Sequence, residues 1–163
     1  MEHKPAFAFR FAGRDDCALI KRFINALAEY ERLDDESVVT EGLLAEWLFD
    51  KGAAEVLFAV VDGNEVGFAL FFTNFSTFLG RAGLYLEDLF VIDDFRGQGV
   101  GSAMLRELAG IAIKRGYGRF ELACLDWNTP SIEFYRSLGA EVMSDWTTYL
   151  FSGDVLIRLA TGK

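Results

Sequence analysis

The sequence has few of the residues on which several common enzyme mechanisms and scaffolds depend. Its 163 residues include two cysteines, two prolines and one histidine. Two cysteines are too few for a disulfide scaffold, and both Cys17 and Cys124 lie in apolar-patterned segments, where a free thiol behaves as a small hydrophobic residue. With His3 alone, a histidine-rich metal site or a Ser-His or Cys-His nucleophilic pair is hard to build. We therefore expect neither a metal ion nor a covalent enzyme intermediate.

Long hydrophobic runs and an excess of positive charge are also missing. Apolar residues make up 52% of the chain, but charged residues interrupt them, and no run reaches the roughly 18 apolar residues that a membrane span needs. The first residues lack the pattern of a secretory signal, so we expect a cytoplasmic protein without a membrane segment. A net charge of -9 repels nucleic acid and favours a cationic ligand, although it also fits ordinary acidic solubility.

Apolar periodicity predicts strands mixed with helices. Helices are expected to begin near Asp15, Thr40, Ser102 and Thr129. Strands are expected at 7–11, 56–61, 66–75, 81–92 and 120–125, with one or two closing strands at 143–151. The turn sequence at 62–64 predicts an antiparallel hairpin. The residues from 153 on have no decisive period. Because no linker or repeat is present, we expect a single α/β layered domain over residues 1–163.

A glycine-rich loop connects the strand that ends near Ile92 to the following helix. Its sequence is Arg96-Gly97-Gln98-Gly99-Val100-Gly101. Glycines let backbone N–H groups approach an anion closely, and a helix N-terminus adds unpaired donors and a charge of about +0.5. The loop lacks the Gly-Lys-Ser/Thr of a Walker motif and the glycine spacing of a Rossmann motif. We therefore expect it to bind a pyrophosphate other than that of a nucleoside triphosphate or NAD.

The sequence resembles the GCN5-related N-acetyltransferase (GNAT) superfamily. Arg-x-x-Gly-x-Gly between a strand and a helix is similar to the coenzyme A loop of that superfamily. Residues 85–91 and 125–135 closely resemble segments of its spermidine/spermine and thialysine N-acetyltransferases, and residues 27–31 are similar to the same group. Leu-Asp-Trp-Asn at 125–128 is more similar to the thialysine branch. The resemblance implies a mixed, mostly antiparallel central sheet flanked by helices, acetyl-coenzyme A as co-substrate, and a homodimer.

The resemblance also implies roles for individual residues. Tyr135 would be the general acid that protonates the departing thiolate, because a phenol has an ordinary pKa of about 10. Glu87 would be the candidate base for the substrate amine. The residues expected to bind acetyl-coenzyme A are Leu89, Phe90, Val91, Arg96, Gly97, Gln98, Gly99, Val100, Gly101, Ser102, Asn128, Ser131 and Tyr135. The residues expected to contact the amine substrate are Tyr30, Glu31, Glu87, Asp88, Glu121, Leu122 and Ala123.

Several of these residues have structural explanations as well. Asn128 can cap the following helix, and Tyr135 can be a core aromatic residue. Glu87 or Asp88 can pair with Arg81 or Arg96. Because Glu87 and Asp88 alternate across a strand, we expect one carboxylate to point into the cleft and the other away.

The function expected from the sequence is acetyl transfer by direct attack of a primary amine. The acceptor would be a small cationic substrate, either a polyamine or diamine or a lysine-like amino acid such as thialysine. Two alternatives stay open at this point. The acceptor can be a protein amine or an aminoglycoside, because the coenzyme loop does not encode it. The chain can also be a catalytically silent coenzyme A-binding module that regulates a partner.

Overall fold

The computed structural model describes residues 7–33 and 37–162, so that His3 lies outside the described residues. Contacts within the chain group it into two compact units, Met1–Ala123 and Cys124–Lys163. The first unit holds the sheet, the helices around it and the glycine loop. The second unit holds the segment with Asn128 and Tyr135 and the C-terminal residues.

The first unit is built on a five-stranded sheet with the order β1-β2-β3-β4-β5. Neighbouring strands are antiparallel except β4 and β5, which are parallel, so the expected mixed and mostly antiparallel sheet is confirmed. Asp62 and Gly63 both have positive φ, 49° and 78°, as a two-residue hairpin turn requires, and the predicted hairpin is confirmed. The strands are β1 (Ala8–Phe11), β2 (Glu55–Val61), β3 (Asn64–Ser76), β4 (Arg81–Val91) and β5 (Phe120–Leu122).

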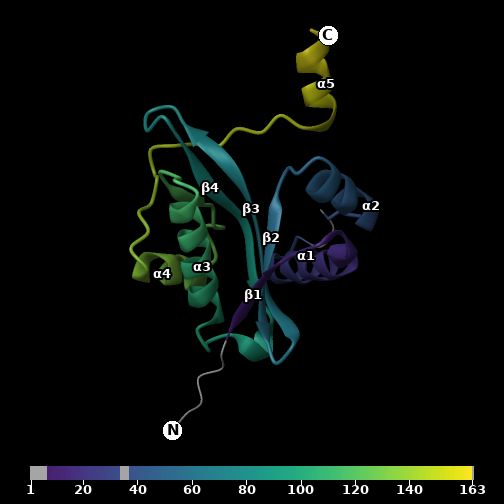
Figure 1. Ribbon diagram of the computed structural model, residues 1–163. Coiled ribbons are helices and arrows are strands. Elements are labelled where there is room, and N and C mark those ends of the chain that lie inside the picture. Colours follow the sequence, from purple (N-terminus) through teal and green to yellow (C-terminus); the bar gives the residue numbers. More distant parts are fainter. Residues whose placement is uncertain (1–6, 34–36, 163) are drawn as a thin grey trace. The chain divides into compact units, whose positions relative to one another are not determined.

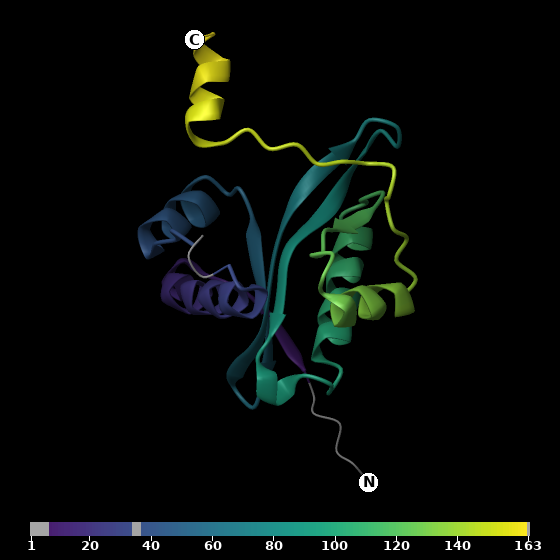
Figure 2. The ribbon, with the colours of Figure 1, turned by 180° about the vertical axis from the view of Figure 1, so that it is seen from behind.

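Helices cover both faces of this sheet (Figure 1). Helices α1 (Cys17–Glu31) and α2 (Glu41–Leu44) lie on one face, and α3 (Val100–Lys114) lies on the other, which Figure 2 shows from behind. Short helical turns in the described part of this unit are η1 (Arg14–Asp16), η3 (Ala45–Asp50) and η4 (Asp93–Phe95). The predicted cap of α2 is confirmed, because Thr40 Oγ1 accepts a hydrogen bond from the Leu43 N–H at 3.1 Å.

Aromatic side chains dominate the core between α1 and the sheet. The Phe23 ring of α1 stacks on Phe68 with ring centroids 5.5 Å apart, and the rings of Phe58 and Phe90 lie against it as well. Cys17 belongs to the same core, where burial raises the pKa of its thiol. The buried residues of α1 recur every three or four positions, which is why this segment forms a helix with one apolar face.

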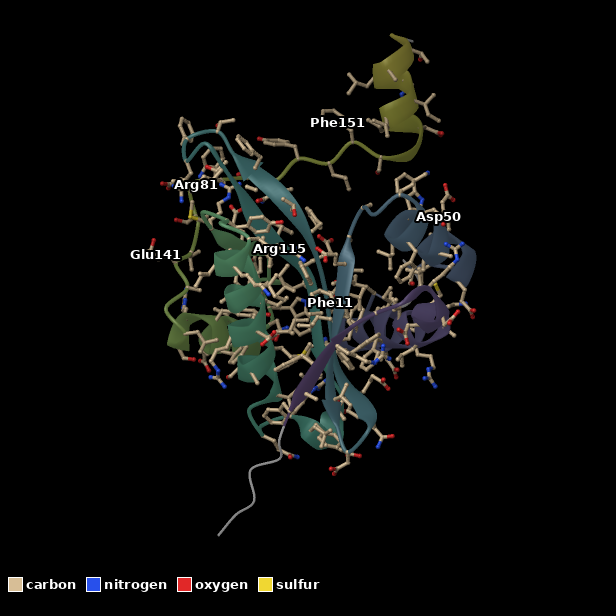
Figure 3. All side chains as sticks on the ribbon, in the orientation of Figure 1. Phe11, Asp50, Arg81, Arg115, Glu141 and Phe151 are labelled. Carbon is tan, nitrogen blue, oxygen red and sulfur yellow. The ribbon has the colours of Figure 1, made fainter. Side chains whose placement is uncertain are left out.

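Ion pairs join neighbouring elements at the surface of the first unit. Arg115, just after α3, pairs with Glu55 at the start of β2, and Asp50 of η3 pairs with Arg14 (Arg115 and Asp50 are labelled in Figure 3). The Arg115–Glu55 pair is partly exposed and contributes at most about 1 kcal/mol to stability, and the Arg14–Asp50 pair is more exposed and therefore more strongly screened by water. The packing of the apolar core, more than these pairs, sets the position of the helices.

Gly67 of β3 allows α3 to pack closely against the sheet. A Cβ atom added at Gly67 would lie 2.6 Å from Met104 Sδ, 3.1 Å from Ala59 Cβ and 3.3 Å from Val100 Cγ1. The side chains of Met104 and Val100 are 0% and 1% exposed, so neither can move aside without disturbing its neighbours. Because Val100 begins α3, this contact also places the glycine loop that precedes the helix.

We expect Gly67→Ala to lower the free energy of unfolding by about 1–3 kcal/mol, the usual cost of overpacking a core. Urea denaturation measures this change. Gly110→Ala is the matched control, because Gly110 is exposed on α3 and an added Cβ meets nothing within 4 Å. That variant should gain about 0.5–1 kcal/mol from its better helix propensity. Equal stability of the two variants would contradict the close approach of α3 at Gly67.

The second unit begins with a helix whose limits follow from its sequence. Helix α4 (Thr129–Ser137) starts after Asn128, whose Oδ1 accepts a hydrogen bond from the Ser131 N–H at 3.4 Å. Pro130 lies in the first turn, where its missing N–H costs nothing. Gly139 follows the helix with φ 91°, the left-handed conformation typical of a helix end. The predicted start and stop of this helix are both confirmed.

The prediction of closing strands at 143–151 is wrong. Residues 124–162 contain no strand, and 143–151 follow an irregular path with Trp146, Tyr149 and Phe151 exposed (Phe151 is labelled in Figure 3). An apolar alternation forms a strand only where a neighbour pairs with its backbone, and the second unit offers no such neighbour. The predicted strand at 120–125 is likewise shorter, because β5 ends at Leu122.

A helix that the sequence did not predict ends the chain. Helix α5 (Gly153–Thr161) has Asp154 in its first turn and Gly162 after its last, with φ 67°. Helix α4 has the same length but starts with a capping Asn128 and with Pro130 in its first turn, whereas no side chain caps the start of α5. None of the helices within 7–33 and 37–162 combines the length and the apolar character needed to cross a lipid bilayer.

Candidate active site

The glycine loop leads directly into the N-terminus of α3. Gly97 and Gly99 have φ values of 73° and 87°, which residues with a side chain rarely adopt. Helix α3 begins at Val100 rather than at the predicted Ser102, so that Gly101 and Ser102 belong to its first turn. The predicted loop is therefore confirmed as a strand-to-helix connection, and its last residues are helical.

Backbone donors at the start of α3 are suited to an anion. The first backbone hydrogen bond of the helix runs from the Ala103 N–H to the Gly99 carbonyl oxygen at 3.0 Å. The N–H groups of 100–102 therefore have no acceptor inside the helix, and Gly99, at the N-cap, has no side chain that could cap them. These donors and the positive end of the helix dipole fit the oxygens of a diphosphate such as that of coenzyme A.

Strand β4 continues beyond its neighbour β5. The two strands pair from Leu84↔Phe120 to Leu86↔Leu122, whereas β4 runs on to Val91 and stays paired with β3 on its other edge. Within the described residues, no strand lies beside residues 87–91 on the β5 side. An extended ligand with amide groups can pair with such an edge. The Phe90 ring is buried in the core, so only its backbone is available to a ligand at this edge.

A β-bulge interrupts β4 at Glu87. Leu70 of β3 pairs with Asp88, whereas the next residue, Phe71, pairs with Leu86, so Glu87 has no residue opposite. Residues that pair directly lie on the same face of a sheet, and adjacent residues lie on opposite faces. Leu86 and Asp88 therefore lie on opposite faces, and Asp88 is directed to the face that α1 covers. The simple alternation assumed from the sequence does not hold across this bulge.

The bulge creates an acidic cluster at the end of α1, formed by Glu31, Glu87 and Asp88. Burial, and then the charges of Glu87 and Glu31, raise the pKa of the Asp88 carboxyl to about 7. Burial also raises the pKa of Glu31. Among the described residues, no Lys or Arg forms an ion pair with Glu87 or Asp88, and Arg96 pairs with Asp93 instead at 2.9 Å. A cluster of carboxylates without a cation is suited to bind an ammonium group and to accept its proton near neutral pH.

Arg96 lies against aromatic rings at the same end of α1. Its Cζ atom lies 4.6 Å from the centroid of the Tyr30 ring and 5.1 Å from that of Phe90. Its Nε donates a hydrogen bond to the Val91 carbonyl oxygen at 2.8 Å. The structure therefore brings together Tyr30, a predicted amine contact, with Phe90 and Arg96, which were predicted to bind the cofactor. Sequence spacing gave no signal for this contact.

The residues on and after β5 that were predicted to contact the amine, Glu121, Leu122 and Ala123, are not part of the acidic cluster. The Glu121 carboxylate accepts a hydrogen bond from Asn74 Nδ2 at 2.6 Å and pairs with Arg119 Nε at 2.9 Å. Its charge is thus already balanced within the first unit. Leu122 is half-buried and Ala123 is exposed. A role for these residues in binding the amine stays a prediction.

The second unit holds the other predicted site residues. Tyr135 lies on α4, half-buried, with its ring 5.3 Å from that of Phe134 at an interplanar angle of 49°. Asn128 is buried and caps the helix. The capping role of Asn128 is therefore confirmed, whereas Tyr135 is half-buried and does not belong to the buried core. The catalytic role of Tyr135 and the cofactor role of Asn128 stay predictions. The cap fixes the first turn of the helix that carries the tyrosine.

A small cavity in the first unit lies apart from all of these residues. It is lined by residues of β1, η3 and β2, namely Phe11, Ala12, Leu48, Phe49, Ala54, Glu55 and Val56. None of the predicted site residues contributes to it. Its lining is mainly apolar and offers no group for acyl transfer. Over the described ranges, no three His, Cys, Asp or Glu side chains are arranged to hold a metal ion.

Comparison with known proteins agrees with the geometry of the loop and the sheet. The model of the acetyltransferase (GNAT) family matches residues 20–140. Thialysine N-epsilon-acetyltransferase from Sus scrofa is 36% identical over 163 residues, covering 93% of this chain and 95% of its own length. Spermidine/spermine N(1)-acetyltransferase-like protein 1 from Homo sapiens is 32% identical and covers 94% of this chain, which spans 24% of that longer protein.

A solved structure has the same fold. An integron cassette protein from the mobile metagenome of V. cholerae superimposes with a TM-score of 0.79 at 28% identity, covering 94% of this chain and 97% of its own. The family match extends over more than half of the chain, and the backbone donors at the start of α3 fit the diphosphate of coenzyme A. The chain therefore belongs to the acetyltransferase (GNAT) family and is an acetyl-coenzyme A-dependent N-acetyltransferase.

Proposed function

We propose that this enzyme acetylates the terminal primary amine of a small cationic substrate, with a lysine-like amino acid such as thialysine as the first candidate and a diamine or polyamine as the second. The observation that carries the proposal is the acidic cluster of Glu31, Glu87 and Asp88. The carboxyl pKa values of Glu31 and Asp88 are raised, and no cation forms an ion pair with Glu87 or Asp88 in the described part of the chain. An ammonium group supplies the missing positive charge. The net charge of -9 favours the approach of a cation.

The choice of substrate class rests on similarity as well as on charge. The thialysine relative matches nearly its whole length, whereas this chain spans only a quarter or so of the spermidine/spermine-like relative. The match to the family model includes residues of both units, which supports treating residues 1–163 as one acetyltransferase domain. A lysine-like substrate places its terminal ammonium group as a diamine does and adds a carboxylate at its other end.

The proposed reaction needs one proton acceptor and one proton donor. The amine nitrogen forms a bond to the acetyl carbon, the carbon–sulfur bond breaks, and the products are an amide and the coenzyme A thiol. The carboxylates at the β4 bulge, Glu87 and Asp88, hold the ammonium group and accept its proton. Tyr135 donates a proton to the leaving sulfur and regains one from the amine nitrogen as the amide forms, so that the single proton released overall is the one that the carboxylates accepted. The free edge of β4 at 87–91 holds the pantetheine amides.

Kinetics with a panel of amines tests this proposal. Thialysine, lysine, ornithine, diaminopropane and spermidine are each assayed for thiol release from acetyl-coenzyme A, and mass spectrometry locates the acetyl group. We expect kcat/KM to be at least about tenfold higher for thialysine than for spermidine, a difference of about 1.4 kcal/mol in transition-state binding. Lysine with its terminal amine already acetylated is the control and should not react.

The two alternatives to this proposal have distinct outcomes when an aminoglycoside and a peptide with a free N-terminus are added to the panel and calorimetry measures coenzyme A binding. Turnover confined to an aminoglycoside or to a peptide N-terminus would show that the acceptor is an aminoglycoside or a protein amine rather than a small cationic amine. Calorimetric binding of coenzyme A without turnover on any amine would indicate a silent binding module.

A homodimer is also proposed, supported by the exposed apolar residues Leu156 and Leu159 of α5, and light scattering tests it. The cytoplasmic location expected from the sequence stays a prediction.

We expect Gly99→Ala to raise the dissociation constant for coenzyme A at least about tenfold. Gly99 has φ 87°, and a residue with a side chain in this left-handed region costs about 1–2 kcal/mol, which the loop relieves by turning its N–H groups away. Isothermal titration calorimetry measures the affinity. Gly80→Ala is the matched control, because Gly80 has φ 62° in the β3–β4 turn and carries similar strain away from the loop. Equal coenzyme A affinity in both variants would exclude the loop as the phosphate site.

A further inference from the structure

We propose that Arg96 is a positioning residue for the acceptor side of the reaction, because its guanidinium group joins Tyr30 at the end of α1 to the turn that leads into the coenzyme A loop. The sequence predicted Arg96 only as a cofactor ligand. The inference rests on the proposed function, and it assigns the grip on the diphosphate to the loop backbone and the Arg96 side chain to the amine site.

Polar contacts of Arg96 close the turn between β4 and the glycine loop. Its Nε donates to the Val91 carbonyl oxygen at 2.8 Å, and its Nη2 pairs with Asp93 Oδ1 at 2.9 Å. Its backbone N–H donates to the Asp93 carbonyl oxygen at 3.1 Å. The chain enters Gly97 directly after these contacts. Two nitrogen atoms of the guanidinium group, Nε and Nη2, thus contact residues of the turn itself.

The same guanidinium group lies over the aromatic rings of the acceptor side. The Arg96 Cζ atom is 4.6 Å from the centroid of Tyr30 and 5.1 Å from that of Phe90. Tyr30 and Phe90 also meet edge to face, with ring centroids 6.4 Å apart. Phe90 is held in the core by Phe23 of α1. Arg96 and Phe90 together therefore hold Tyr30 from two sides.

Tyr30 lies in the last turn of α1, and it is 37% exposed. The helix ends at Glu31, where Arg32, with φ 61°, and Leu33 donate backbone hydrogen bonds to the carbonyl oxygens of Glu29 and Ala28. This backbone cap holds the main chain, whereas Arg96 and Phe90 contact the Tyr30 ring itself. Glu31 follows Tyr30 directly and lies close enough to Asp88 to raise the pKa of that carboxyl. When Arg96 fixes Tyr30, it also fixes the distance between two members of the acidic cluster that binds the amine.

This contact requires arginine rather than any cation. A guanidinium group is planar, so it donates hydrogen bonds in its plane and stacks on rings with its face at the same time. A lysine ammonium group keeps the charge but cannot do both. Stacking of a cation on an aromatic ring contributes about 0.5–1 kcal/mol at exposed sites and more when the pair is desolvated. Arg96→Lys therefore removes the link while it keeps a positive charge beside the glycine loop.

The test compares Arg96→Lys, Tyr30→Leu and the double variant with the wild-type enzyme. For each protein, calorimetry gives the dissociation constant for coenzyme A, and steady-state kinetics at saturating acetyl-coenzyme A gives KM and kcat for the best amine of the panel. We expect either single variant to raise the amine KM about tenfold and to change coenzyme A affinity less than about threefold. The amine KM of the double variant should be no higher than that of the more impaired single variant, because the same contact is lost in all three proteins. Arg22→Lys, an exposed arginine on α1, is the matched control.

Several results would overturn the inference. A large loss of coenzyme A affinity in Arg96→Lys with an unchanged amine KM would make the side chain a phosphate ligand. Multiplied effects in the double variant would show that Arg96 and Tyr30 act independently. If Arg96→Lys does not fold by circular dichroism, Tyr30→Leu alone must still raise the amine KM with coenzyme A affinity unchanged, or the inference fails. Absence of wild-type turnover on every amine would instead overturn the proposed function, and with it this inference.

Discussion

Replacement of Tyr135 by phenylalanine is expected to lower kcat for acetyl transfer by about 10²–10⁴-fold, the usual contribution of a positioned general acid. The ring of Tyr135 is half-buried beside Phe134 on α4, and phenylalanine keeps that packing. Only the hydroxyl group and its proton are lost. The departing thiolate then has to leave without protonation, which raises the barrier of the chemical step.

The measurement is steady-state turnover at saturating acetyl-coenzyme A and amine. Dissociation constants for coenzyme A and the unfolding midpoint should change little, because the helix and its Asn128 cap remain. Tyr149→Phe is the matched control: Tyr149 is 83% exposed in the second unit, and its loss should leave kcat unchanged. If Tyr135→Phe also retains wild-type kcat, Tyr135 is not the acid.

Replacement of Asp88 by asparagine is expected to lower kcat/KM for the amine by about 10–100-fold at pH 8 and to change its pH dependence. The carboxyl of Asp88 has a pKa of about 7, raised by burial and by the neighbouring Glu87 and Glu31. Below that pH the group is neutral and neither attracts an ammonium group nor accepts its proton. The wild-type kcat/KM should therefore rise as the pH passes through about 7, and this rise should be absent in the variant.

A stability measurement tests the same carboxyl without any assay of turnover. Its pKa in the folded protein is about 7, whereas an unfolded aspartate has a pKa of about 3.9. Between these values the folded state binds the proton more tightly, so the contribution of Asp88 to stability falls as the pH rises, and the full penalty is present above the folded pKa. Asp88→Asn should therefore stabilise the protein most above pH 7 and give no pH-dependent gain below about pH 4.

Urea denaturation across this pH range provides the comparison, with Asp15→Asn as the control because Asp15 is exposed on η1. A stability difference that does not vary with pH would show that the Asp88 carboxyl titrates normally. Such a result would remove the physical basis for Asp88 as a cation-binding group. A functional site that holds like charges close together lowers the stability of the folded protein, so removal of one charge is expected to raise it.

Part of the candidate site could be predicted because its signals are local. The glycines at 97 and 99, the cap at Asn128 and the turn at 62–63 each specify a backbone conformation through residues that are neighbours in the chain. The same is true of the helices that the apolar period indicated. The resemblance to a known family supplied the expected roles of Tyr135 and Glu87, which no local pattern could provide and which stay predictions.

Other features could not be predicted, because they depend on pairs of residues far apart in the sequence. The closing strands expected at 143–151 are absent from the second unit, since an apolar alternation does not say whether a neighbouring strand exists. The bulge at Glu87 depends on how β4 pairs with β3, and a shift of one residue moves every following side chain to the other face. Alternation therefore failed at the position where the two carboxylates lie.

The sequence by itself determined the family, the glycine loop and the local limits of most helices, because these depend on steric and hydrogen-bonding preferences within a few residues. Only the tertiary structure decided that Asp88 lies under the end of α1 beside Glu31, and that Arg96 stacks on Tyr30. Those contacts join residues more than 50 positions apart, and their energies depend on burial and on charges that assemble only when the strands and helices pack.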